Sequence, residues 1–143
     1  MNNEQLAKEL LDCFDNFNTE RVLNRLKLSY KGENIILFLL MELGGSGTPG
    51  QLYERVDFSA ARLSAIIKSL ESKGYVEKNK NRKDKRSSIV EITGEGFMYF
   101  MSLRRQIVEN AMTIIEKLGE DDVKQLLRII GRLGEISNSM EER

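Results

Sequence analysis

The side chains best suited to chemistry in this sequence are cations gathered near its middle. Between Lys73 and Arg86, seven basic residues stand against two acids, Glu77 and Asp84. A local excess of this kind attracts polyanions even in a neutral chain, because surface charges act over only about 10 Å at 0.1 M salt. The whole chain has 22 basic and 22 acidic residues, so its bulk charge predicts no partner. An isolated charge run is usually a solvated loop, and the elements around this run therefore decide its meaning.

The residue types needed for catalysis or for a transition-metal site are largely missing. The sequence contains no histidine, which removes the usual general base and the commonest transition-metal ligand. The glycine-rich residues 44–47 are not followed by a lysine at the spacing of a phosphate-binding loop. Asp121 and Asp122 suit the first turn of a helix, where the helix dipole favours acids. We therefore expect no enzyme, no catalytic residue, no metal site and no cofactor.

Membrane insertion and export are not indicated by the sequence. The longest apolar run, Ile35–Met41, is far shorter than the roughly 20 residues of a membrane-spanning helix. The first residues lack the basic start and apolar core of a signal peptide. The single cysteine, Cys13, cannot form an internal disulfide, which favours a reducing compartment. We expect a cytoplasmic protein with no membrane partner.

The residues around the basic run predict two helices followed by a hairpin. Thr48, Pro49 and Gln51 form the capping-box pattern that begins a helix. Ser59 suits the cap of a second helix that ends at Gly74. The buried side of that second helix is Leu63, Ile66, Ile67 and Leu70. Strands are predicted at 75–80 and 88–92, with a polar hairpin tip at 81–85. This order is typical of a winged helix-turn-helix.

Amphipathic helices are predicted on both sides of the winged segment. One apolar face near the N-terminus is formed by Leu6, Leu10, Phe14 and Phe17. After the hairpin, Thr93 suits the cap of a long helix over 95–118, and a final helix begins at Glu120. The fold class is therefore mainly α with a small β-hairpin wing (α+β).

A helix with one buried and one polar face has a physical use on DNA. The major groove is about 12 Å wide and accepts one helix, and small outward residues allow close approach to base edges. Arg62 can donate to guanine, while the basic hairpin tip can reach the neighbouring backbone or minor groove. Asp84 is expected to orient Arg86, or another cation of the tip, by a charge-assisted hydrogen bond. The candidate DNA-binding residues are Ser59, Ala60, Ala61, Arg62, Ser64, Lys68, Arg82, Lys83, Asp84, Lys85 and Arg86.

The same segments resemble the MarR family of bacterial and archaeal regulators. The similarity runs through residues 48–52, 59–76, 82–87 and 92–96, and its most specific part is the Asp84-x-Arg86 signature of the wing. It implies an obligate homodimer that binds a pseudopalindromic operator in double-stranded DNA, often as a repressor released by a small molecule or an oxidant. It further implies N-terminal dimerisation helices at 1–34, a DNA-binding lobe at 35–93 and C-terminal dimerisation helices at 94–143. Ala65 stands where the family often has a polar or basic residue, so base preference cannot be transferred.

The homodimer can also be argued from size. The helix predicted over 95–118 is about 36 Å long at 1.5 Å per residue, which exceeds what a small winged core covers. Its apolar stripe, and those of the first and last helices, need a further surface. The alternative is that these terminal helices pack only on one another within one chain.

The effector and its site are less clearly marked. In the resembled family an effector usually lodges between the dimer helices and the winged lobe, which makes Phe17, Tyr30, Phe38 and Met41 the candidate lining residues. Cys13 suggests a redox-sensing regulator as an alternative. Its apolar neighbours and the lack of nearby cations instead favour a buried or neutral, inert thiol. A third possibility is a winged-helix protein–protein interaction module, against which the basic wing argues.

Overall fold

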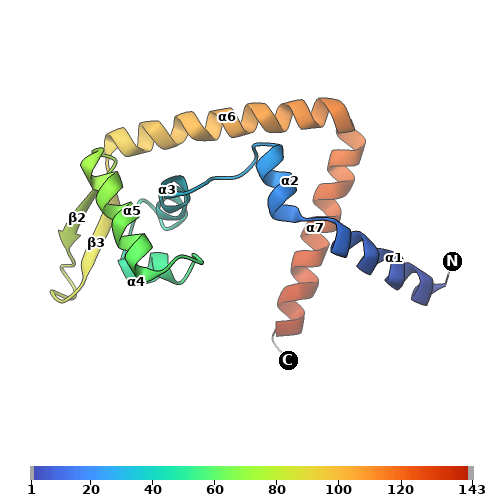
Figure 1. Ribbon diagram of the computed structural model, residues 1–143, viewed down its shortest axis with the longest axis horizontal. Coiled ribbons are helices and arrows are strands. Elements are labelled where there is room, and N and C mark those ends of the chain that lie inside the picture. Colours follow the sequence, from blue (N-terminus) through green and yellow to red (C-terminus); the bar gives the residue numbers. More distant parts are fainter. Residues whose placement is uncertain (1, 142–143) are drawn as a thin grey trace. The chain divides into compact units, whose positions relative to one another are not determined.

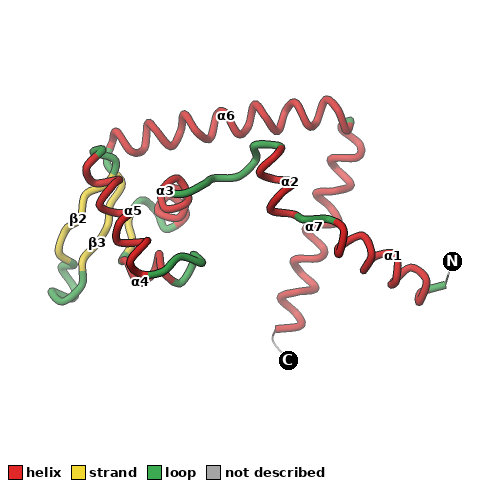
Figure 2. The backbone as a smooth tube through the Cα atoms, in the orientation of Figure 1, coloured by secondary structure: helices red, strands yellow, loops and turns green. Residues whose placement is uncertain are grey.

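The structure is a computed structural model that describes residues 2–141. It is mainly helical, with one small sheet (Figures 1 and 2). The helices are α1 (Asn3–Asn16), α2 (Thr19–Arg25), α3 (Glu33–Glu42), α4 (Pro49–Tyr53), α5 (Ala60–Ser72), α6 (Gly94–Leu118) and α7 (Glu120–Glu141), and the strands are β1 (Ser46–Gly47), β2 (Val76–Lys80) and β3 (Ser88–Ile92). The chain forms two compact units. The winged unit is Ser29–Gln106, and the terminal unit comprises the described residues up to Leu28 and from Ile107 onward.

The winged unit contains the hydrophobic core. α3 is central to this core because it packs against α4, α5, β1 and β3. The fully or nearly fully buried side chains are Ile36, Leu37, Leu40, Leu52, Leu63, Ile67, Leu70, Val76, Val90 and Phe100. The buried side predicted for the second helix is therefore confirmed at Leu63, Ile67 and Leu70, while Ile66 is only partly buried.

The sheet is antiparallel with strand order β1-β3-β2. β2 and β3 form the predicted hairpin, in a register that pairs Val76 with Ile92 and Lys80 with Ser88. The two-residue β1 pairs with the other edge of β3, through Ser46 opposite Glu91. The hairpin is thereby anchored to the chain segment that follows α3. We call β2, β3 and the loop at 81–87 between them the wing.

Short-range hydrogen bonds begin the helices of the helix-turn-helix where the sequence predicts. Gln51 N donates to Thr48 Oγ1 at 3.1 Å, and Thr48 N donates to Gln51 Oε1 at 2.9 Å, which completes the capping box of α4. Ser59 Oγ accepts from Arg62 N at 3.1 Å and begins α5. These bonds fix where α5 starts, and so which residues occupy its first turn.

The end of α5 is joined directly to the start of α6. Thr93 Oγ1 donates to the Gly74 carbonyl at 2.5 Å and accepts from Gly96 N at 3.0 Å, while Thr93 N donates to the Tyr75 carbonyl at 3.0 Å. Gly96 lies so close to the backbone just before β2 that a Cβ on it would stand 2.0 Å from the Tyr75 carbonyl oxygen. Only glycine permits this approach.

The terminal unit has a different character. In the described part of the chain, α1, α2 and α7 bury no side chain. Large apolar residues are exposed on all three helices and on the second half of α6, including Leu6, Leu10, Phe14, Leu23, Met112, Ile115, Leu126, Ile130, Leu133 and Ile136. The exposed faces of α1, α6 and α7 are the amphipathic stripes that the sequence predicts.

The sequence pattern missed one helix of this unit. Phe17 was expected on the apolar face of the first helix, but it caps the end of α1 and lies outside it. Asn18 then begins α2 by accepting from Arg21 N at 2.8 Å. The four-and-three spacing from Leu6 to Phe17 therefore extends beyond the helix, because Asn18 provides a new start at the next residue.

Substituting Gly96 tests the junction between α5 and α6. We expect Gly96→Ala to lower the free energy of unfolding by about 1–3 kcal/mol, since the added methyl group must displace the Tyr75 backbone. Gly94→Ala is the matched control, because it meets nothing within 4 Å and adds a better helix former at the start of α6. The measurement is urea unfolding at one fixed protein concentration. Equal effects of the two substitutions would contradict the close approach.

Candidate nucleic-acid interface

The outward face of α5 is small and polar. Every candidate DNA-binding residue of this helix and its cap is exposed: Ser59, Ala60, Ala61, Arg62, Ser64 and Lys68. Leu63, Ile67 and Leu70 hold the opposite face in the core. The chain therefore presents a helix with methyl and hydroxyl groups near its first turn, which is the surface that close approach to base edges requires.

Arg62 has a partner that sequence reasoning missed. Its guanidinium carbon lies 4.2 Å from the centre of the Phe58 ring, just before α5. Stacking on an aromatic face restrains the side chain, while the N–H donors in the guanidinium plane stay available for hydrogen bonds. The spacing of four residues between an aromatic and an arginine across a helix start is the signal that could have revealed the contact.

The wing loop is shaped by its own polar side chains. Asn81 Nδ2 donates to Ser87 Oγ at 3.1 Å, and Asn81 Oδ1 accepts from Lys83 N at 3.0 Å. Asp84 Oδ1 accepts from the backbone N–H of Arg86 at 3.0 Å. The expectation that Asp84 orients a cationic side chain by a charge-assisted hydrogen bond was wrong, because among residues 2–141 its carboxylate bonds the Arg86 backbone and forms no ion pair. Asp84 therefore fixes the course of the loop and leaves the cationic head groups projecting from it.

The cations of the wing loop are available to an external anion. Arg82, Lys83, Lys85 and Arg86 are all exposed. Among the ion pairs of residues 2–141, none involves these four side chains. Their charges are therefore uncompensated at close range, as contacts to phosphate oxygens require.

A shallow hollow of about 340 Å³ joins α5 to its neighbours. Ala60, Ser64 and Lys68 line it from α5, and Tyr53 lines it from α4. Lys78 of β2 also lines it, so the outward side of α5 and one strand of the wing share a surface. Tyr53 was not among the sequence candidates, and its half-exposed ring on a five-residue helix is the signal that could have indicated it.

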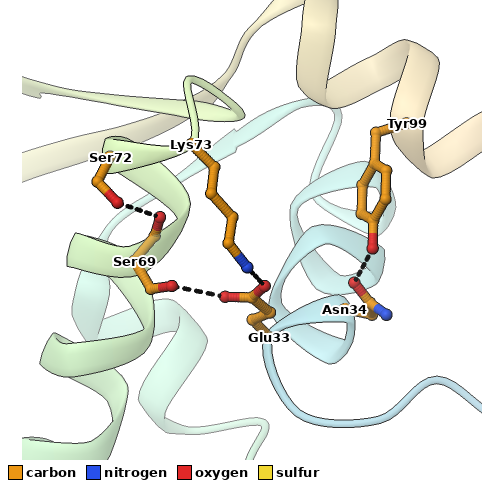
Figure 3. Close-up of polar contacts among 6 residues, drawn as sticks. All are labelled: Glu33, Asn34, Ser69, Ser72, Lys73 and Tyr99. Carbon is orange, nitrogen blue, oxygen red and sulfur yellow. Dashed lines mark hydrogen bonds and ion pairs between the residues drawn. The ribbon is translucent and has the colours of Figure 1, made fainter.

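An ion pair holds the opposite end of α5 (Figure 3). Lys73, which follows α5, is paired with Glu33 at the start of α3, and Ser69 Oγ donates to the same carboxylate at 2.9 Å. The Lys73 ammonium group and its hydrogen bond lower the pKa of Glu33, which partial burial opposes. The hydrogen bond to Glu33 raises the pKa of Lys73. The first cation of the basic run is thus committed to an internal contact.

The candidate effector residues are divided between the two units. Tyr30 stacks on Phe38 and on Phe100, with ring centres 4.9 and 5.4 Å apart. Met41 is half-buried against the same core. Phe17 belongs to the terminal unit, where it is exposed and lines a shallow depression with Cys13. Within the winged unit, the structure therefore groups Tyr30 with Phe38.

Cys13 differs from expectation in its exposure. The sequence favoured a buried or neutral thiol, but the Cys13 side chain is exposed on α1. The expectation of burial was wrong for this chain because the apolar neighbours at Leu10 and Phe14 are themselves exposed.

The described residues hold neither a cluster of metal-ligating side chains nor a helix able to span a membrane. Within residues 2–141, no three or more metal-ligating side chains of Cys, Asp or Glu come together. None of the helices described is both long and apolar enough to cross a membrane.

Comparison with known proteins agrees with this geometry. Residues 35–87, which contain α3, α4, α5 and most of the wing, match the model of the MarR family. This segment of the chain is therefore similar to the MarR family, and the solved structures that it resembles share its winged-helix fold. The curated relatives that the chain matches are described as HTH-type transcriptional regulators.

Three similar proteins illustrate the likeness. The HTH-type transcriptional regulator PecS of Dickeya dadantii is 26% identical over 116 residues, which cover 80% of this chain and 69% of PecS. Wild-type apo MarR from E. coli superposes with a TM-score of 0.65 at 19% identity, over 93% of this chain and 97% of that one. The organohalide-sensing regulator RdhR-CbdbA1625, bound to 2,4-dichlorophenol, has a TM-score of 0.57 at 20% identity, over 93% and 80% of the two chains. At these identities the structures establish the fold.

The Glu33–Lys73 pair predicts a pH-dependent stability. Because the pKa of Glu33 is lowered, its contribution is present above its ordinary pKa of 4.5 and is lost as the pH falls through the lowered value. Because the pKa of Lys73 is raised, its contribution is present below its ordinary 10.5 and is lost as the pH rises through the raised value. We expect wild type to exceed Glu33→Gln in thermal unfolding temperature near neutral pH, and this advantage to vanish in acid.

The matched control for this measurement is Glu42→Gln. Glu42 is exposed at the other end of α3 and takes no part in the pair with Lys73. Its substitution removes the same charge from the same helix. If the difference in unfolding temperature between wild type and Glu33→Gln stayed constant across the whole pH series, the ion pair would not stabilise the fold.

Proposed function

We propose that this chain acts in the cytoplasm as a homodimeric transcriptional regulator that places α5 in the major groove of DNA. The observation that carries the proposal is the exposed small and polar face of α5, which shares a surface hollow with the β2 strand of the wing. A helix and a basic hairpin on one surface can meet the groove and the adjacent backbone together. The match of residues 35–87 to the model of the MarR family supports the same interpretation.

The roles of the two elements differ in this proposal. Arg62, in the first turn of α5, reads a base edge, while Arg86 and the other wing cations contact backbone or the minor groove. Ser59, Ser64 and Lys68 contribute phosphate or base contacts beside Arg62. Asp84 acts indirectly, because it holds the loop that carries the cations. The contacts of α5 therefore set specificity, and those of the wing set overall affinity.

The terminal unit supports a homodimer. Its helices expose apolar faces along their length, and monomeric proteins rarely leave extended apolar surface uncovered. A second copy of the chain would cover such faces and bring two copies of α5 to one operator. The two half-sites would then lie about 34 Å apart, or a small multiple of that.

We further propose that the chain is a repressor released by a small molecule. One solved MarR-type relative is described as organohalide sensing and holds 2,4-dichlorophenol, which supports a small aromatic compound as the effector class. Tyr30, Phe38 and Met41 are the candidate contacts in the winged unit, and Phe17 is the candidate in the terminal unit. A ligand acts in this way only if it binds the DNA-free arrangement more tightly than the DNA-bound one.

Arginine substitutions can distinguish sequence-specific contacts to bases from sequence-independent contacts to phosphates. We expect Arg62→Ala to lower affinity for an operator, selected from genomic fragments, more than affinity for random duplex, by about 1–3 kcal/mol of discrimination. Arg86→Ala should weaken both duplexes alike and reduce the salt dependence by about one phosphate contact. Asp84→Ala should act like a milder Arg86→Ala, since it loosens the loop and keeps the cation.

The measurement is equilibrium binding of each variant to both duplexes across a salt series. An unchanged affinity and salt slope for Arg86→Ala would remove the wing from the interface. Failure of wild type to bind any duplex at low salt would favour the protein–protein interaction module instead.

The assembly is tested by sedimentation. At micromolar concentration we expect about twice the 16.4 kDa mass of the chain. Ile130→Glu, on the exposed apolar face of α7, should shift the protein toward monomer because a carboxylate cannot be buried in an apolar contact without a large penalty. Asn138→Glu adds the same group to α7 outside its apolar positions and should leave the mass unchanged. A 16.4 kDa species for wild type would refute the homodimer.

A further inference from the structure

The first turn of α3 holds two neighbouring elements at once (Figure 3). Glu33 accepts from Ser69 Oγ at 2.9 Å and pairs with Lys73, which ties α3 to the end of α5. The next residue, Asn34, accepts from the Tyr99 hydroxyl at 3.2 Å, which ties α3 to α6. All of these residues belong to the winged unit.

Tyr99 completes the joint from the other side. Its ring stacks on Tyr75 with centres 4.5 Å apart and planes 9° from parallel. Tyr75 follows Gly74, whose carbonyl accepts from Thr93 Oγ1. The end of α5 is therefore held by α3 through Glu33 and by α6 through the Gly74–Tyr75 segment.

The apolar contacts of α5 do not fix its tilt by themselves. Leu63, Ile67 and Leu70 bury against the core, but hydrophobic contact is non-directional. Within residues 2–141, the side-chain hydrogen bonds and ion pair that join α5 and its C-cap to α3 all converge on Glu33. The directional restraint between these two helices thus rests on one carboxylate.

The restraint lies far from the residues that would read DNA. Arg62 and Lys73 are eleven positions apart, which is about 17 Å along a helix axis. A tilt of about 5° at the restrained end would move Arg62 by about 1.5 Å, enough to spoil a hydrogen bond to a base edge. A small loss of alignment at Glu33 is thereby magnified at the first turn of α5.

We propose that Glu33 is a positioning residue for DNA recognition, which sets the tilt of α5 through Ser69 and Lys73. The inference rests on the proposed DNA-binding function and assigns it a determinant that does not touch DNA.

Simple electrostatics predicts the opposite effect for Glu33. An acid beside a basic run repels phosphates, so its removal should strengthen binding to every duplex and free the Lys73 cation. A positioning role predicts weaker binding to the operator alone. The sign of the change at the operator therefore separates the two roles.

The experiment measures operator and random-duplex affinity for four proteins: wild type, Glu33→Gln, Lys73→Gln and the double variant. We expect Glu33→Gln to lower the operator-to-random affinity ratio about fivefold to tenfold, with random affinity unchanged or slightly raised. In the Lys73→Gln background the same substitution should lower the ratio by less than about twofold, because the ion pair is already absent. Ser69→Ala, which keeps every charge, should lower the ratio in the same direction by less.

Glu42→Gln is the charge-matched control and should leave the ratio unchanged. Two results would overturn the positioning role. One is an equal rise in affinity for both duplexes, which is pure electrostatics. The other is an equal fall for both duplexes that tracks a fall in unfolding temperature, which is loss of folded protein. If wild type bound no duplex, the proposed function itself would fail, and this inference with it.

Discussion

The winged unit depends on the closeness of α6 to the backbone of Tyr75. A methyl group at Gly96 would overlap the Tyr75 carbonyl oxygen, so the absence of a side chain lets α6 lie directly against the backbone that precedes β2. Thr93 uses this closeness to bond both Gly74 and Tyr75. The end of α5 and the start of α6 are thereby bonded to each other, although the whole hairpin separates them in sequence. The candidate DNA-binding residues lie on α5, which ends at this junction, and on the wing, which begins and ends at it.

The sequence predicts elements whose signals are local. The start of α4 follows from the reciprocal bonds of Thr48 and Gln51, and the start of α5 from Ser59, because each signal needs only three residues. The strands were placed within a residue of β2 and β3 for the same reason. The order of these elements is itself typical of a winged helix-turn-helix, and the resemblance to the MarR family adds the expectation of a homodimer on a pseudopalindromic operator.

Features that depend on distant contacts could not be predicted. Glu33 and Lys73 are 40 positions apart, and each looks like an ordinary surface charge until the core brings α3 against α5. Asp84 was expected to act on a side chain, but the tight turn brings a backbone N–H closer. The exposure of Cys13 was not predicted from the sequence. An apolar helix face indicates that the helix needs a partner surface, but it does not say whether the same chain provides that surface.

The internal bonds of the wing loop bear on the thermodynamics of docking. Ordering one residue of a free chain costs about 1–2 kcal/mol in backbone entropy. The loop at 81–87 has already lost much of that freedom, since Asn81 and Asp84 hold its backbone before any anion arrives. The free energy with which the loop binds phosphates should then come mainly from the release of counterions. Folding of the loop should add little to the binding enthalpy. Arg82, Lys83 and Lys85 can therefore be exchanged for other cations at little cost in binding free energy. Asn81 and Asp84 cannot, because their side chains hold the backbone of the loop.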